Sequence, residues 1–140
     1  MCAALILCAS ARGDTTLDLA AYAGKVIYLD FWASWCAPCR QSFPWMDSVQ
    51  RDYLSKGLVV VAVNVDQERA LADRFLQQMS PHFRIVFDPK GAVAESYKVS
   101  GMPASFIIDR HGTVRFRHLG FRDDAKARLD AELNTLLAEK

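Results

Sequence analysis

Long apolar runs, separated by amphipathic stretches, dominate the hydrophobic pattern of the chain. Residues 25–32 and 58–65 are rich in β-branched and aromatic side chains, which is typical of strands buried on both faces of a sheet. Residues 104–109 form a third such run, and residues 85–87 form a shorter one. Residues 113–118 instead alternate between apolar and basic side chains, which predicts an edge strand with one solvated face.

Helical periodicity fills the intervals between these runs. Residues 37–55 repeat apolar side chains at spacings of three or four, and Gly57 follows as a stop signal. Asp66 is a favourable N-cap for a second helix that extends to about Met79. Leucines on one face of residues 122–139 predict a final helix.

The order of these elements predicts the fold class. Helices between apolar strands indicate parallel pairing, whereas the short loop at 110–112 joins two strands as an antiparallel hairpin. A short helix at 92–97 precedes that hairpin. We therefore expect an α/β fold in which a central mixed β-sheet is flanked by helices on both faces, in one domain over residues 14–140.

Residues 1–13 differ from the rest of the chain. A short apolar run at 1–9 is followed by small residues that resemble a signal-peptide cleavage site, although no Lys or Arg precedes the run. The run falls short of the roughly 20 residues that cross a membrane. We interpret it as a residual signal or leader segment, truncated here, of a periplasmic or otherwise extracytoplasmic protein. The alternative is a first strand of the domain, and the fate of Cys2 and Cys8 depends on which holds.

Composition and charge add little to this picture. The length of 140 residues suits one domain with one core. A formal net charge of +1 points to neither nucleic acid nor an anionic membrane as a partner, and a monomer is the default expectation.

The candidate chemistry lies in Cys36 and Cys39. Cys36 falls where a strand ends and a helix begins, so unpaired N–H groups and the helix dipole favour its thiolate, which is the nucleophilic form. Cys39 lies one turn further along the same face and can attack a mixed disulfide formed at Cys36. Ala37 leaves the turn uncluttered, and Pro38 occupies a position where its missing N–H costs nothing.

Two other interpretations of the cysteine pair are weaker. A zinc site needs two more ligands at matching spacing, and the three histidines are isolated. An inert structural disulfide over so short a loop would constrain the unfolded chain little. We therefore expect no metal and no cofactor other than the redox-active disulfide itself.

The segment DFWASWCAPC at residues 30–39 resembles the active-site segment of the thioredoxin superfamily. Pro44 resembles the kinking proline of these proteins, and Gly101, Met102 and Pro103 resemble their cis-proline loop. The motifs FWASWC, FDPKG and FIID are most similar to bacterial TlpA/ResA-like thiol–disulfide reductases. The resemblance covers roughly residues 17–137 and implies a thioredoxin-like fold.

The resemblance also implies roles for individual residues. Asp30 matches the buried carboxylate beneath the cysteines, where it would relay a proton to or from Cys39. Pro103 matches the cis-proline that faces the disulfide, and the backbone of Met102 would pair with an extended substrate segment. Together with these two, the implied substrate-binding residues are Trp35, Ala37 and Pro38.

Trp32 and Trp35 would flank the site as an apolar contact surface, and a position wholly within the core is the alternative, above all for Trp32. Two positions depart from the family pattern. Ser42 stands where the cytochrome-maturation branch carries a Glu, which argues against a dedicated role on apocytochrome c. Ala62 stands where thioredoxin has a lysine near the buried aspartate, so Asp30 should be harder to ionise.

The expected function is therefore that of a thiol–disulfide oxidoreductase that reduces disulfides of extracytoplasmic proteins. Its partners would be protein thiols and disulfides, with a membrane electron donor of the DsbD kind implied by resemblance. A disulfide oxidase or isomerase remains an alternative, because the sequence does not give the reduction potential. A redox-inactive module that binds peptides or copper is the alternative from a different class.

Overall fold

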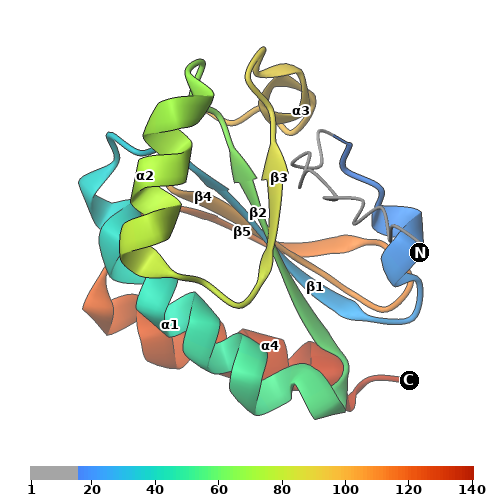
Figure 1. The fold of residues 1–140 in the computed structure, drawn as a ribbon. Helices are drawn as coiled ribbons and strands as arrows, with labels where there is room; N and C mark the ends of the chain where they lie inside the picture. The colour runs from blue at the N-terminus through green and yellow to red at the C-terminus, as the bar shows by residue number, and fades with distance from the viewer. Residues whose placement is uncertain (1–15) are drawn as a thin grey trace, which may run out of the picture.

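The computed structural model describes residues 16–140, so the expectations for the leader segment or first strand, and for Cys2 and Cys8, lie outside the described residues. Five strands form one sheet in the order β3-β2-β1-β4-β5 (Figure 1). They are β1 (Val26–Trp32), β2 (Leu58–Asn64), β3 (Arg84–Phe87), β4 (Ala104–Ile108) and β5 (Val114–Leu119). Strands β1, β2 and β3 are parallel, whereas β4 and β5 pair antiparallel, which confirms the expected mixed sheet.

Helices cover both faces of this sheet, as the sequence predicted. They are α1 (Ala37–Tyr53), α2 (Arg69–Met79), α3 (Ala92–Ser96) and α4 (Lys126–Ala138), with short 3-10 turns at Leu19–Tyr22, Leu54–Lys56 and Asp123–Ala125. Helices α1, α2 and α4 pack on one face, and α3 packs on the other with the first 3-10 turn. Helices α1 and α4 are also joined directly, because the Tyr53 hydroxyl donates to Asp130 Oδ1 at 2.6 Å.

Strand β1 separates the two halves of the core. All seven of its residues are buried, and their side chains point alternately to the two faces. Tyr28 and Trp32 join the cluster under α1 and α4, whereas Leu29 and Phe31 join the opposite cluster. Asp30 therefore points toward the face that α1 covers, which is also the face of the cysteines.

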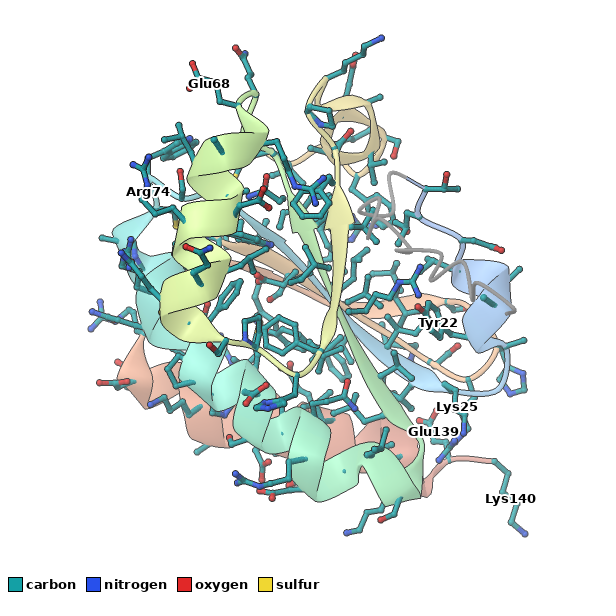
Figure 2. All side chains as sticks on the ribbon, viewed as in Figure 1. Tyr22, Lys25, Glu68, Arg74, Glu139 and Lys140 are labelled. Atoms are coloured by element: carbon teal, nitrogen blue, oxygen red, sulfur yellow. A yellow bond between two sulfur atoms is a disulfide. The ribbon has the colours of Figure 1, made fainter. Side chains whose placement is uncertain are left out.

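The start of α2 differs from the prediction. The helix begins at Arg69, and its N-cap is Glu68, which is labelled in Figure 2. The Glu68 side chain makes no capping hydrogen bond. Asp66 was predicted to be the cap, but its carboxylate is already engaged by Ser34 and Asn64. The hydrogen bonds with Ser34, which is distant in the sequence, have replaced the expected cap of α2.

Arg110, in the loop before β5, ties distant segments together. Its guanidinium donates to the backbone carbonyls of Gly24, Lys56, Leu137 and Glu139 at 2.8–3.1 Å. These carbonyls come from the start of the sheet, the end of the second 3-10 turn and the C-terminal end of the chain. The hairpin loop, predicted only as a turn, therefore also anchors the C-terminal end of α4 to the sheet.

Candidate active site

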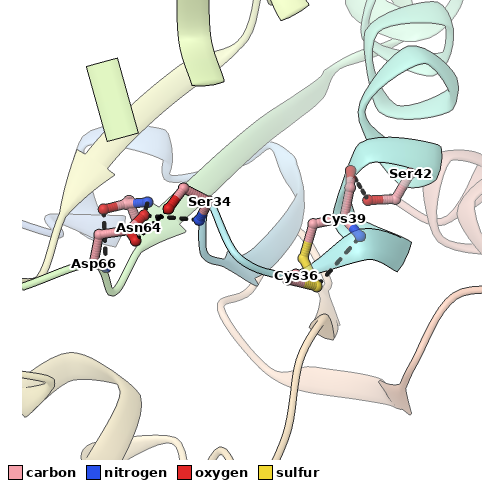
Figure 3. Close-up of a disulfide and its surroundings, with 6 residues drawn as sticks. All are labelled: Ser34, Cys36, Cys39, Ser42, Asn64 and Asp66. Atoms are coloured by element: carbon pink, nitrogen blue, oxygen red, sulfur yellow. Dashed lines mark hydrogen bonds between the residues drawn. A yellow bond between two sulfur atoms is a disulfide. The ribbon is translucent and has the colours of Figure 1, made fainter. Parts of the chain in front are cut away.

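The two cysteines lie where β1 gives way to α1, and they form a disulfide (Figure 3). Their Cα atoms are 5.3 Å apart. Cys36 is the N-cap of α1, and its Sγ accepts a hydrogen bond from the Cys39 N–H at 3.3 Å. Cys36 keeps 4% of its surface exposed and Cys39 keeps none, so only Cys36 is open to a partner molecule.

The segment before Cys36 is held to the end of β2. The Ser34 N–H and hydroxyl donate to the two carboxylate oxygens of Asp66 at 2.8 and 2.7 Å. Asn64 donates to the same carboxylate at 2.7 Å and accepts from the Asp66 N–H at 3.1 Å. This network, visible in Figure 3, fixes the approach to the helix N-terminus and was not anticipated from the sequence. Its only sequence signal is a polar Asn-x-Asp at the end of an apolar strand.

Asp30 is a buried acid without a balancing charge from its neighbours in the sheet. It is 1% exposed, and burial raises the pKa of its carboxyl well above the ordinary value. Its cross-strand partners are Ala62 on β2 and Ser105 on β4, so the position opposite it on β2 holds no cation, as the sequence suggested. Asp30 Oδ2 has no hydrogen-bond partner within the part of the chain that the structure describes.

Tyr28 is a second buried titratable residue on this face, and Asp30 affects its pKa. Burial raises the pKa of the Tyr28 hydroxyl, and the nearby Asp30 charge raises it further. A hydrogen bond with Ser105 partly offsets this effect. Tyr28 and Asp30 therefore share one poorly solvated environment, in which a negative charge is costly.

Ser42 lies on the buried face of α1. It is 1% exposed, and its hydroxyl donates to the Cys39 carbonyl at 3.0 Å. The side chain is thus satisfied within its own helix and carries no charge. Asp30 is the acid that the structure places on the cysteine side of β1.

The predicted cis-proline loop lies just before β4. The peptide bond between Met102 and Pro103 is cis, as the resemblance implied. Pro103 is buried, and its carbonyl accepts from the Gly120 N–H at 2.7 Å, which joins the loop to the end of β5. Met102 is half-buried and packs against the core cluster that contains both cysteines.

Two of the three tryptophans belong to the active-site segment, and they differ in exposure. Trp35 is 70% exposed beside Cys36, and Ala37 and Pro38 are also exposed. Trp32 is fully buried, with its ring centroid 4.9 Å from that of Phe43. The expectation that Trp32 forms part of a contact surface is therefore wrong. The reason is strand alternation, which turns Trp32 into the core under α1.

Leu119 is a further residue of this region that the sequence analysis overlooked. It is 68% exposed, and its Cδ1 lies 3.3 Å from where a Cβ on Gly101 would stand. The predicted strand ended at His118, one residue short of Leu119. The available signal was an apolar residue at an outward position that follows Arg115 and Arg117.

Residues 16–140 contain no cluster of three or more His, Cys, Asp or Glu side chains that could hold a metal ion. Within the same range, no helix has the length and apolar character needed to cross a membrane.

Comparison with known proteins agrees with this geometry. The family model described as Redoxin matches residues 5–133. The chain is 34% identical to the thiol-disulfide oxidoreductase ResA of Geobacillus kaustophilus and to that of Bacillus subtilis, over 69% and 70% of its length. It spans only 56% and 55% of these relatives. A crystal structure of a Chlorobium tepidum protein, provisionally named thiol:disulfide interchange protein DsbE, is 50% identical with a TM-score of 0.84. That match covers 86% of this chain and 85% of the other.

Proposed function

Because the chain belongs to the Redoxin family, we propose that it is a thiol–disulfide oxidoreductase that exchanges disulfides with proteins through Cys36 and Cys39. The observation that carries this proposal is the position of the disulfide. It spans the first turn of a 17-residue helix, Cys36 is the one cysteine of the pair that keeps any exposed surface, and the loop of Pro103 is joined to the neighbouring strand end.

The roles of the two cysteines follow from their order in the helix and from the small exposed surface that only Cys36 of the pair keeps. In the reduced protein, the Cys36 thiolate attacks one sulfur of a substrate disulfide, and the other substrate sulfur leaves as a thiolate. The Cys39 thiolate then attacks Cys36 Sγ, which forms the Cys36–Cys39 disulfide and releases the second substrate thiolate. Two electrons pass from the protein dithiol to the substrate, which ends as two thiols.

We propose that Asp30 relays the proton of Cys39 in the second step, the attack of Cys39 on Cys36 Sγ. Cys39 must lose its proton before it can attack, and Cys39 is fully buried. Burial favours the protonated form of Asp30, so a carboxyl that has passed its proton on readily takes another back, which suits a relay of protons to or from Cys39. This assignment rests on the resemblance, on the face that Asp30 occupies and on its unpaired Oδ2.

Substrate recognition is assigned to the surface around Cys36. We infer that the backbone of Met102 pairs with an extended substrate segment beside Pro103. The exposed side chains of Trp35, Ala37 and Pro38 would contact the residues that flank the substrate cysteine.

The proposal also covers direction, location and partners. We infer reduction as the direction, with the protein acting as a monomer outside the cytoplasm, where oxidising conditions sustain disulfides as substrates. A membrane electron donor of the DsbD kind would return the pair to the dithiol state.

Insulin reduction followed by turbidity tests the enzyme proposal. We expect activity in the wild type and none in Cys36→Ser, whereas Cys39→Ser should accumulate a mixed disulfide with its substrate. Ser42→Ala is the matched control, because it alters the same helix face without touching a sulfur. Equal turbidity curves for the wild type and Cys36→Ser would refute the proposal.

Equilibration of the pair against glutathione tests the direction. The reduction potential of thioredoxin is about −270 mV and that of DsbA is about −120 mV. A value close to that of thioredoxin supports a reductase, and a value close to that of DsbA would make the protein an oxidase or isomerase.

A further inference from the structure

A small groove beside the active-site segment is not used by the reaction described above. It has a volume of about 180 Å³ and lies between the start of α1 and α2. At roughly 30 Å³ for each water molecule, this α1–α2 groove has room for about six, which suits one side chain of a partner protein. It is lined by a residue of the loop before α1, a residue of α1 and four residues of α2, namely Ser34, Arg40, Leu71, Arg74, Phe75 and Gln78.

The α1–α2 groove adjoins the exposed part of the disulfide. Ser34, in its wall, stands two residues before Cys36, and two residues of extended chain span at most about 7 Å. Trp35, between them in the chain, is 70% exposed. The wall is also fixed, because the Ser34 N–H and hydroxyl donate to Asp66 at 2.8 and 2.7 Å. A substrate whose cysteine lies at Cys36 therefore places a nearby side chain at the groove.

The guanidinium of Arg40 is held within the α1–α2 groove. Its Cζ lies 4.7 Å from the centroid of the Phe75 ring, and its Nη1 donates to Gln78 Oε1 at 2.8 Å. Phe75 is 2% exposed, so its ring is a fixed apolar base for the guanidinium. Both of these partners are neutral, and a guanidinium has five N–H donors. Arg40 is thus fixed in place while its charge and several of its donors remain available to a ligand.

Arg74 contributes a second positive charge from α2. Leu71, Arg74, Phe75 and Gln78 are spaced by three or four residues, so they lie along one face of the helix. Figure 2 shows Arg74 on the side of α2 that faces the start of α1. Within residues 16–140, neither Arg40 nor Arg74 has a carboxylate at ion-pair distance. The two side chains therefore bring two unneutralised charges to one groove.

The acids nearest the α1–α2 groove do not neutralise it. The carboxylate of Asp66 already accepts hydrogen bonds from the loop before α1 and from β2. Asp73 is paired with Arg69 at 2.9 Å. Glu68 precedes Arg74 by six residues, which corresponds to about 9 Å along a helix axis. A carboxylate that pairs with both arginines must therefore come from another molecule.

We propose that Arg40 and Arg74 together bind one carboxylate side chain of the protein substrate, so that the enzyme prefers disulfides with Asp or Glu close to the cysteine that Cys36 attacks. The proposal rests on the function proposed above and adds the substrate class to it. Guanidinium groups match a carboxylate with paired N–H···O hydrogen bonds, which gives specificity as well as affinity. Leu71, 37% exposed in the groove wall, would contact the methylene groups of the acidic side chain.

Peptide disulfides that differ at one position test this proposal. Each substrate is a short peptide joined to a second copy of itself by a disulfide, with Gln, Glu or Lys on either the N-terminal or the C-terminal side of its cysteine. The rate constant for reduction by the reduced full chain is divided by that for 2-mercaptoethanol, so that the intrinsic reactivity of each disulfide cancels. We expect Glu on one side to raise this ratio roughly tenfold over Gln, and Lys on that side to lower it.

The position of the Glu distinguishes a binding site from general attraction. A single groove on one side of Cys36 favours Glu on one side of the substrate cysteine, whereas long-range attraction between opposite charges favours both sides alike. An equal gain from the two Glu peptides would therefore overturn the proposal.

Variants of the two arginines assign the preference to the α1–α2 groove. Arg40→Gln/Arg74→Gln should abolish the difference between the Glu and Gln peptides. Arg74→Glu, a single change at an exposed position of α2, should make the Lys peptide react faster than the Glu peptide. Arg51→Gln is the matched control, because Arg51 is an exposed arginine near the far end of α1 and should leave the order of the peptides unchanged. Circular dichroism checks that each variant is folded, and Arg74→Glu carries the test if the double variant is not.

The outcomes separate this inference from the proposed function. If no peptide is reduced, the proposed function itself fails. If all peptides are reduced at one corrected rate, the oxidoreductase stands and the acidic preference is wrong. A preference that persists in both arginine variants, or that is lost in Arg51→Gln, would also overturn the assignment to this groove.

Discussion

Replacement of Asp30 by Asn should change how the stability of the protein depends on pH. In the folded state, burial raises the pKa of this carboxyl well above its ordinary value, and its partners across the sheet, Ala62 and Ser105, carry no charge. In the unfolded chain, the same group titrates near the ordinary value of about 3.9. The Asp30→Asn substitution keeps the shape of the side chain and removes its titration.

The sign of the effect follows from where the proton resides. Below the unfolded pKa, Asp30 is protonated in both states, and its stabilising contribution is fully present. As the pH rises, the unfolded chain loses the proton while the folded protein keeps it, so the free energy of unfolding falls. The loss amounts to about 1.4 kcal/mol per pH unit between the unfolded pKa and the raised folded pKa, and it stops above the latter.

Urea unfolding of the oxidised protein between about pH 4 and 8 measures this difference. The stability of Asp30→Asn relative to the wild type should increase with pH by about 1.4 kcal/mol per unit above the unfolded pKa, and it should level off once the pH passes the raised folded pKa. Other groups titrate alike in both proteins and cancel, and the disulfide keeps the two thiols from titrating. Asp52→Asn, at an exposed position on α1, is the control and should show no such slope. A difference between Asp30→Asn and the wild type that is constant with pH, or that falls as pH rises, would refute the reasoning.

Three further predictions concern the support of the site. Trp32→Ala should lower the free energy of unfolding by about 3–5 kcal/mol because Trp32 is fully buried, whereas Trp35→Ala should change it by less than about 0.5 kcal/mol; urea denaturation separates the two. Asp66→Ala should cost about 1–3 kcal/mol and speed hydrogen exchange of the Ser34 amide, and unchanged protection of that amide would contradict the role of the network. Arg110→Lys should cost about 1–3 kcal/mol in thermal unfolding, because one ammonium cannot reach all the carbonyls that the guanidinium joins; an unaltered melting temperature would argue against this role.

The sequence alone determined the elements and the reactive pair. Strands β1 and β2 were predictable because a run of β-branched and aromatic residues has few other stable arrangements. The hairpin of β4 and β5 was predictable because the short loop between the two strands is a local turn signal. Cys36 at the start of α1 needed only the boundary between a strand pattern and a helix pattern.

Tertiary structure decided what each polar or aromatic side chain contacts. Asp66 has the composition of a helix cap, but it bonds to Ser34, 32 residues away in the sequence. Trp32 and Trp35 are similar in the sequence, yet strand alternation buries one and the helix turn exposes the other. Such outcomes depend on contacts between segments distant along the chain, and local periodicity carries no information about these contacts.

Arg110 shows the same limit most clearly. In the sequence it stands in a short loop between two strands. Only the folded arrangement brings its guanidinium to the backbone carbonyls of Gly24, Lys56, Leu137 and Glu139. Chain order thus determines which chemistry is available, and the folded arrangement determines which of these groups meet, because the interaction of charges depends on their separation in space and not along the chain.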